Sequence, residues 1–130
     1  MILVDSSAWV EYLRATGSAA HLRVRTALMK AEIAVCDAIS MEVLAGARNK
    51  SHLRDLNHLL ARAVMLETLS LDYGIAASIH RACRHQGETP RSLIDCLIAA
   101  VAIRGEVTLL HADRDFGVIA RHTTLRVISK

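Results

Sequence analysis

Residues 2–12 carry the sequence ILVDSSAWVEY, and this stretch decides the fold class. Ile2 to Val4 is a short apolar run typical of a buried strand, and the turn-capable Asp5, Ser6 and Ser7 follow it. A helical pattern then runs from Ala8 to Arg14. A strand that passes through a short turn into a helix opens a β–α unit, which predicts a parallel sheet.

The rest of the chain continues this alternation. Further strands are predicted at residues 33–36, 64–69, 107–110 and 125–128, and helices at 18–31, 38–46, 53–63, 72–86, 90–104 and 116–121. Asp37 is expected to cap the third helix, and Thr89 with Pro90 to start the sixth, because proline is tolerated at a first helical position. The pattern predicts an α/β fold: a three-layer α/β/α sandwich with a central, mainly parallel sheet of four to five strands.

Composition indicates one folded domain. A chain of 130 residues is expected to form a single domain, residues 1–130, with a core of its own. An apolar content of 52% argues against disorder, and aromatics at only 3% leave the core to Leu, Ile, Val and Ala. The net charge of +3 permits a polyanionic partner but is weak evidence by itself.

Cysteine usage and apolar runs bear on localisation. The three cysteines lie in apolar segments without a C-x-x-C pair, as expected of reduced core residues in a cytoplasmic protein. Asp5 follows after only four residues, which leaves no room for the basic and apolar regions of a secretory signal. The longest uninterrupted apolar run, from Cys96 to Ile103, is too short to span a bilayer. No membrane association is predicted.

Acids stand at the edges of the core-forming segments. Asp5 follows the first strand, Glu42 lies in the near-apolar stretch 38–47, Asp95 interrupts the apolar helix 93–103, and Asp113 and Asp115 follow the fourth strand. In open parallel sheets, ligands bind beyond the carboxyl ends of the strands, where these segments converge. Carboxylates suit hard cations such as Mg²⁺ and Mn²⁺. The pattern therefore predicts one acidic, metal-binding pocket.

Each acid also has a structural alternative. Asp5 is a good turn or cap residue, Asp95 fits the [ST]-x-x-[DE] capping box, and the two acids after the fourth strand can cap the short helix there. Glu42 is harder to explain in this way, since its neighbours leave no clearly solvated helix face. Taken singly these alternatives hold, but they do not account for the clustering.

Basic residues accompany the acids. His80, Arg81, Arg84 and His85 fall at helical spacing, and Arg91 stands just before the helix of Asp95. These side chains are candidates for lining the approach to the pocket and holding phosphates, although an ordinary solvated helix face would look the same. The histidines show no spacing suited to zinc.

Four motifs follow one another along essentially the whole chain: residues 2–12, MEVLAG at 41–46, RSLIDCLIAA at 91–100 and HADRDF at 111–116. Together they resemble the PIN-domain family, most closely its VapC-type toxins of bacterial toxin–antitoxin pairs. By motif, Asp5, Glu42, Asp95 and Asp113 match the family's catalytic acidic quartet. Asp115 matches a frequent fifth acid, and Ser7 a small hydroxyl that helps hold the pocket.

The resemblance implies a function as well as a fold. It implies an endoribonuclease that depends on Mg²⁺, with Mn²⁺ as a substitute, and that cleaves tRNA or another structured RNA. Asp5 and Asp95 are the residues expected to touch metal directly, with Asp113, Glu42 and Asp115 as further ligands. The expected partners are a cognate VapB-like antitoxin, the RNA substrate and a second copy of the chain in a homodimer.

Other classes stay open at this point. A non-toxin PIN-like protein or a structure-specific nuclease would use similar acids. A non-catalytic Mg²⁺-binding, receiver-like domain would also place an acid after a parallel strand. That class would want an acidic pair near the first strand and a lysine at a strand end, whereas the lysines here are Lys30, Lys50 and Lys130.

Overall fold

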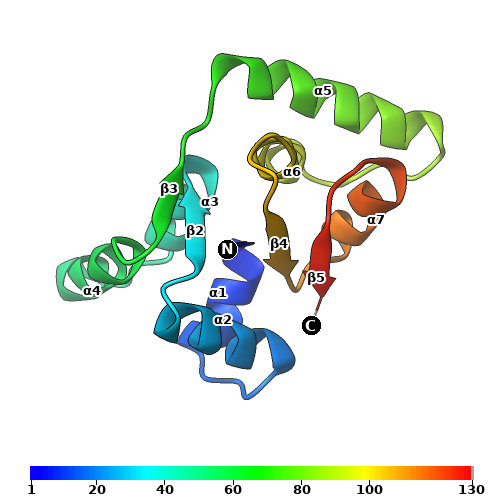
Figure 1. Cartoon of the computed structure of the whole chain (residues 1–130). Coiled ribbons are helices and arrows are strands. Elements are labelled where there is room, and N and C mark those ends of the chain that lie inside the picture. Colours follow the sequence, from blue (N-terminus) through cyan, green and yellow to red (C-terminus); the bar gives the residue numbers. More distant parts are fainter. Residues whose placement is uncertain (130) are drawn as a thin grey trace.

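Strands and helices alternate along the chain in the computed structural model, which describes residues 1–129 (Figure 1). The strands are β1 (Ile2–Val4), β2 (Ile33–Cys36), β3 (Val64–Leu66), β4 (Thr108–His111) and β5 (Val127–Ser129). The helices are α1 (Ser6–Leu13), α2 (Ala19–Met29), α3 (Asp37–Ala45), α4 (Lys50–Leu60), α5 (Ser70–His85), α6 (Leu93–Arg104) and α7 (Arg114–His122).

The five strands form one sheet in the order β3-β2-β1-β4-β5, and every neighbouring pair is parallel. Ile2 pairs with Ile33 on one side and with Thr108 on the other, so β1 lies at the centre of the sheet. The predicted parallel sheet is therefore confirmed. Central β1 and β2 are almost wholly buried, as expected for a sheet with helices on both faces.

Helices from the two halves of the chain cover the sheet. α1 packs on α2 and α3, whereas α5, α6 and α7 pack on one another (Figure 1). The core is aliphatic, as predicted, and the two large aromatic side chains in it, Trp9 and Phe116, are fully buried. α6 carries the run Ile98–Ala102, all of it buried, and so forms the most enclosed helix of this layer.

Several boundaries differ from the sequence prediction. Asp37 is the first residue of α3 and not its cap, because β2 runs up to Cys36 and the helix begins at once. α6 begins at Leu93 and not at Pro90, since the hydroxyl of Ser92 accepts from the backbone N–H of Asp95 and starts the helix there. Asn49 likewise starts α4 three residues before the predicted Leu53 by accepting from His52.

Other features agree with the prediction. α5 ends at His85 and Gly87 follows with φ of 80°, a left-handed conformation that glycine adopts without strain. By contrast, the predicted strand 64–69 is too long: β3 stops at Leu66, because the chain is already turning into α5, whose N-cap is Leu69. No helix within residues 1–129 has both the length and the apolar character needed to cross a bilayer.

Candidate metal centre

The chain changes direction across the sheet at β1, and acids lie at that point. β1 pairs with β2 on one edge and with β4 on the other, and the connections after β1 and β4 lead away in opposite directions. Such a switch point opens a crevice beyond the carboxyl ends of the strands. Asp5 directly follows β1, and Asp113 lies two residues after β4. The fold therefore puts both carboxylates at this crevice.

Asp5 is buried and only half satisfied. Its Oδ2 accepts from the backbone N–H of Ser7 at 3.0 Å and from the Ser7 hydroxyl at 2.5 Å, and this caps α1. Its Oδ1 is buried and has no hydrogen-bond partner in the described part of the chain. A buried carboxylate oxygen without a donor is costly unless a proton or a cation satisfies it.

Ser7 connects the two strands that frame the crevice. Its hydroxyl donates to Asp5 and accepts from the backbone N–H of Ala112 at 2.9 Å. The end of β1 is thereby tied to the turn after β4. Ser7 fixes the position of the Asp5 carboxylate relative to Asp113.

Three further carboxylates come together beside Asp5. Asp95, Asp113 and Asp115 each offer an oxygen, and these oxygens lie within 4.8 Å of one another. Asp95 and Asp115 are buried, whereas Asp113 is about one third exposed. Asp113 also caps α7 by accepting from the backbone N–H of Asp115 at 2.9 Å.

Glu42 approaches this group from α3. It is half-buried, and its Oε1 accepts from the Ser6 hydroxyl at 3.0 Å. It does not belong to the close group of three, but the charges of Asp5 and Asp113 act on it. Ser6, which the sequence analysis treated only as a turn residue, therefore orients Glu42.

The electrostatics of the cluster oppose full ionisation. Burial, followed by the charges of Asp5 and Asp113 and the contact with Asp115, raises the pKa of Asp95 to about 8. Burial also raises the pKa of Asp5, although its hydrogen bonds to Ser7 act the other way. The pKa of Glu42 is raised by burial first and by Asp5 and Asp113 next. The carboxylates therefore need protons or a cation to offset their mutual repulsion near neutral pH.

One arginine supplies part of the positive charge. Arg91 precedes α6, and its guanidinium lies 3.5 Å from Asp115 Oδ1 and 3.8 Å from Asp113 Oδ1. Its backbone N–H donates to Asp115 Oδ2 at 2.9 Å. The side chain is 68% exposed, so the ion pairs are weak and open to competition. Arg91 lies at the acidic cluster itself.

The donor set fits a divalent cation. All candidate ligand atoms are carboxylate oxygens, which Mg²⁺ and Mn²⁺ prefer over softer donors. Asp5 Oδ1 is buried and finds no hydrogen-bond partner within residues 1–129, and Asp95, Asp113 and Asp115 lie close enough to share one ion. Asp115 also has a backbone donor on its other oxygen, which suits a supporting ligand.

His111 is another residue that the sequence analysis did not single out. It is 4% exposed, and its Nδ1 accepts from the backbone N–H of Asp113 at 3.2 Å. Its place as the last residue of β4, two before an acid, was the available signal. The contact holds the turn that carries Asp113.

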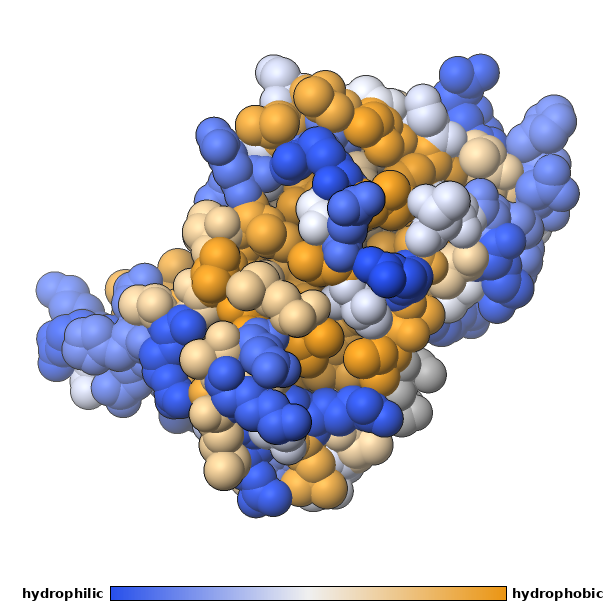
Figure 2. Space-filling view, viewed as in Figure 1, coloured by the Kyte–Doolittle hydropathy of each residue, from blue (hydrophilic) through white to orange (hydrophobic). Residues whose placement is uncertain are grey.

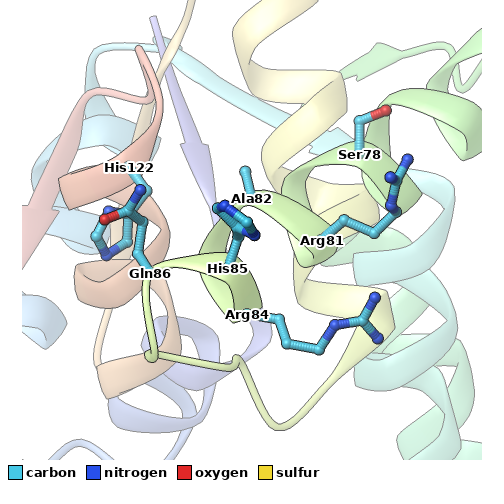
Figure 3. A pocket seen from close by; sticks show the side chains of 7 residues that line it. All are labelled: Ser78, Arg81, Ala82, Arg84, His85, Gln86 and His122. Atoms are coloured by element: carbon cyan, nitrogen blue, oxygen red, sulfur yellow. The ribbon is translucent and has the colours of Figure 1, made fainter.

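The predicted basic residues fall into two places. Arg81, Arg84 and His85 line a groove at the C-terminal end of α5, which they share with His122 of α7 (Figure 3). Arg91 is separate from this groove and contacts the acids. His80 is half-buried and does not line the groove.

Comparison with known families and proteins gives a consistent match. The profile described as PIN domain matches residues 2–122. The chain is 48% identical over 132 residues to the VapC ribonuclease Mb1587 of Mycobacterium bovis, a match that covers 99% of this chain and 98% of the relative. Ribonuclease VapC11 of Mycobacterium tuberculosis matches with the same identity and coverage.

Solved structures agree on the fold. The crystal structure of VapBC2 from Rickettsia felis, bound to a DNA fragment from its promoter, contains a chain that superposes with a TM-score of 0.80. The superposition covers 100% of this chain and 99% of that one, at 16% sequence identity. A similarity at this low identity bears on the architecture and not on the activity.

Proposed function

The chain belongs to the PIN-domain family, and from that membership we propose that it is a metal-dependent endoribonuclease of the VapC type. The observation that carries the proposal is the 48% identity, over 99% of the chain, to proteins named as VapC ribonucleases. The acidic cluster at the switch point of the sheet supports it, because it offers the oxygen ligands such an enzyme needs. We propose Mg²⁺ as the cofactor, with Mn²⁺ as a substitute.

The acids divide into separate tasks in this proposal. Asp5, Asp95 and Asp113 hold the ion directly, and Asp115 supports them as a further ligand. Glu42 either ligates a second ion or orients the attacking water. Ser7 fixes Asp5 and Ser6 orients Glu42 through the hydroxyl contacts described above.

Phosphodiester hydrolysis needs an activated water and compensation for charge on the phosphate and the leaving oxygen. When bound, a divalent ion supplies both by lowering the pKa of water and by neutralising the developing oxyanions. The chain's own part is to arrange its carboxylates before the substrate arrives. Asp95 must lose its proton to act as a ligand, and its pKa of about 8 makes that loss depend on pH near neutrality.

We further propose that the protein is the toxin of a pair whose antitoxin is a VapB-like protein. A groove between α1, α3 and α4 suits a partner segment, since exposed Val10 and Leu13 form its apolar part and Arg14 and Arg48 lie on its rim. The groove reaches Ser6 and Glu42 and so adjoins the acids. Trp9 also lines the groove but is fully buried.

The remaining parts of the proposal concern substrate and assembly. The substrate is RNA, tRNA or another structured RNA, with Arg81, Arg84, His85 and Arg91 as phosphate-binding residues. The protein is a single domain that forms a homodimer in the cytoplasm. A structure-specific DNA nuclease has no specific observation in its favour, and membership of the PIN-domain family argues against a receiver-like domain.

The test is cleavage by variants of the two central acids. Asp5→Asn and Asp95→Asn are each expected to abolish RNA cleavage in Mg²⁺ while the fold survives, because removing a charge from a crowded acidic cluster relieves repulsion. Cleavage is measured on radiolabelled RNA, binding of Mn²⁺ by calorimetry, and folding by thermal melts.

Asp55→Asn is the matched control, since Asp55 is an exposed acid on α4 outside the cluster. This variant should cleave RNA as the wild type does. Near wild-type cleavage by Asp5→Asn or Asp95→Asn would show that the ligand assignment is wrong. Failure of the wild-type protein to cleave RNA with either Mg²⁺ or Mn²⁺ would refute the proposed ribonuclease activity.

A further inference from the structure

A basic groove lies at the C-terminal end of α5, away from the acidic cluster. It has a volume of about 740 Å³, and its lining includes Arg81, Arg84, His85, Gln86 and His122. Figure 3 shows His85 between His122 of α7 on one side and the two arginines on the other. In Figure 2 the surface at this end of α5 is hydrophilic, while apolar residues gather nearer its N-terminal half.

The charge of the groove is positive. Two exposed arginines line it, and none of its lining residues within 1–129 is an acid. Glu88 contacts the lining residue His122, with 2.8 Å between its Oε1 and His122 Nε2, and it is also paired with Arg121. Glu88 therefore balances Arg121, and among the described residues neither Arg81 nor Arg84 forms an ion pair.

The same contacts hold one wall of the groove in place. Hydrogen bonds from Arg121 and then from His122 lower the pKa of Glu88 to about 2, so its carboxylate is charged at neutral pH. Glu88 belongs to the loop between α5 and α6, whereas Arg121 and His122 end α7. The groove is thus built across two elements, and its His122 side is oriented before any ligand arrives.

The groove and the acidic cluster share α7. Asp115 stands in the first turn of this helix and His122 is its last residue. Seven residues of α-helix span about 10 Å, which corresponds to roughly three nucleotides along one strand of a nucleic acid helix. A strand whose scissile phosphate lies at the cluster can therefore reach the groove with a phosphate a few nucleotides away.

We propose that this groove is a second RNA-binding subsite, which grips a backbone phosphate a few nucleotides from the cleaved bond through Arg81 and Arg84, with His85 and His122 beside them. The inference rests on the proposed ribonuclease function and adds where the substrate is held. The groove contributes to the affinity for RNA, and the acids carry out the cleavage. Because the acids repel RNA when no metal is bound, binding without metal depends on the groove.

The experiment measures RNA binding in the presence of EDTA, where no cleavage occurs. Fluorescence anisotropy of a labelled single-stranded RNA dodecamer is followed over a range of salt concentrations for the wild type and for the double variant Arg81→Gln/Arg84→Gln. Each lost phosphate contact on a single strand lowers the salt slope by about 0.7, so the double variant should lose about 1.4 of the slope and about tenfold in affinity.

The double variant Arg23→Gln/Arg25→Gln is the control, because it removes the same charge from two exposed arginines of one helix, α2. It should keep the wild-type slope. A second readout is cleavage in Mn²⁺: the groove variant should lose cleavage of the dodecamer and keep cleavage of a dinucleotide, which cannot reach the groove.

The outcomes separate the inference from the function beneath it. Equal slopes for the two double variants, with RNA still cleaved in Mn²⁺, would overturn the subsite and leave the ribonuclease standing. Loss of affinity for a poly-glutamate peptide but not for RNA would make the groove a protein-binding surface and also overturn it. Wild-type protein that neither binds nor cleaves RNA would remove the proposed function, and the subsite with it.

Discussion

Asp5 uses its two carboxylate oxygens for different purposes. Oδ2 caps α1 through Ser7, and Oδ1 is buried with no hydrogen-bond partner in the portion of the chain that the structure covers. Asp113 likewise caps α7 with one oxygen and lies within the group of three acids. The sequence presented capping and metal binding as alternatives, but a carboxylate has enough lone pairs for both. At these positions the cap orients the ligand.

The protonation of Asp95 gives a prediction about stability. Its pKa is raised from 3.8 to about 8, so the folded state binds the proton more tightly than the unfolded state does. This contribution is fully present below about pH 4 and is lost as the pH rises to about 8. Without metal, Asp95→Asn should therefore raise the Tm at pH 8.5 by at least about 4 °C, which is roughly 1 kcal/mol for a domain of this size.

The measurement is a set of thermal melts in EDTA from pH 4 to pH 8.5. The Tm difference between wild type and variant should be small at pH 4 and should grow with pH. Mn²⁺ at pH 8.5 should stabilise the wild type and not the variant. A Tm difference that does not change with pH would show that Asp95 is ionised throughout.

Arg91 allows a test with two opposite readouts. Its guanidinium is the counterion of Asp113 and Asp115, so a bound cation must compete with it. Arg91→Gln should tighten Mn²⁺ binding by about two- to fivefold, the range expected for an exposed ion pair. The same variant should lower kcat/KM for RNA, because a phosphate-binding group is removed. Calorimetry and cleavage kinetics measure the two effects.

Arg114→Gln is the matched control, since Arg114 is an exposed arginine between the two acids and forms no ion pair with them in the part of the chain described. An equal gain in Mn²⁺ affinity there would assign the effect to general charge. Weaker Mn²⁺ binding by Arg91→Gln would mean that Arg91 supports the cluster and does not compete with the ion.

At the level of elements, α5 and α6 are joined by an ion pair between the buried Asp72 and Arg104, whose side chain is 31% exposed. Asp72 is fully buried, and Arg104 donates to it twice, at 2.9 Å from Nε and 3.0 Å from Nη2. Asp72 and Arg104 lie at the ends of α5 and α6 that are remote from the connecting loop, and Arg91 of that loop contacts the acids. This pair therefore fixes the layer from which Asp95 projects.

Asp72→Asn should lower the free energy of unfolding by about 1–3 kcal/mol, because it weakens the hydrogen bonds of a buried acceptor to Arg104. Urea denaturation measures the loss, and Asp55→Asn, an exposed change on α4, should stay within about 0.5 kcal/mol of the wild type. A loss below about 1 kcal/mol for Asp72→Asn would show that the pair contributes little to joining the two helices.

Element types followed from sequence more readily than element ends did. Apolar periodicity located the five strands and seven helices, since it reflects which face is buried. The ends depend on single side chains: the hydroxyl of Ser92 starts α6, although Pro90 offered an equally good local signal. The capping-box spacing of Ser92 and Asp95 also pointed to this start, but which of two local signals starts the helix depends on which side chain reaches a free backbone N–H in the folded chain.

For the molecule as a whole, the sheet topology predicts where the acids lie, but not where the arginines around them lie. Four segments distant in sequence meet at the switch point, as strand–helix alternation and the rule for open sheets predict. The sequence did not indicate that Arg91 pairs with the acids while Arg81 and Arg84 line a separate groove. That division depends on how the α5–α6 loop lies against α7, a tertiary arrangement without a local signature.

Control of the enzyme by its partner gives the last prediction. The cluster of acids is short of positive charge without metal, and Arg91 satisfies it only weakly. An arginine from an antitoxin segment seated in the α1–α3–α4 groove could enter the cluster from the side of Glu42 and displace the ion, since guanidinium pairs bidentately with carboxylates. The antitoxin should therefore inhibit partly by competing with metal.

Inhibition of RNA cleavage is measured across a Mn²⁺ titration, and the antitoxin concentration for half inhibition should rise about tenfold for a tenfold rise in Mn²⁺ above its dissociation constant. Leu13→Ser, which changes only the apolar part of the groove, should weaken inhibition by the same factor at every Mn²⁺ concentration. Complete indifference of the antitoxin to Mn²⁺ would exclude the arginine and leave steric blocking of RNA as its mode of action. A second outcome would also refute displacement of the metal ion by an arginine: an antitoxin without arginine in its bound segment whose potency still depends on Mn²⁺.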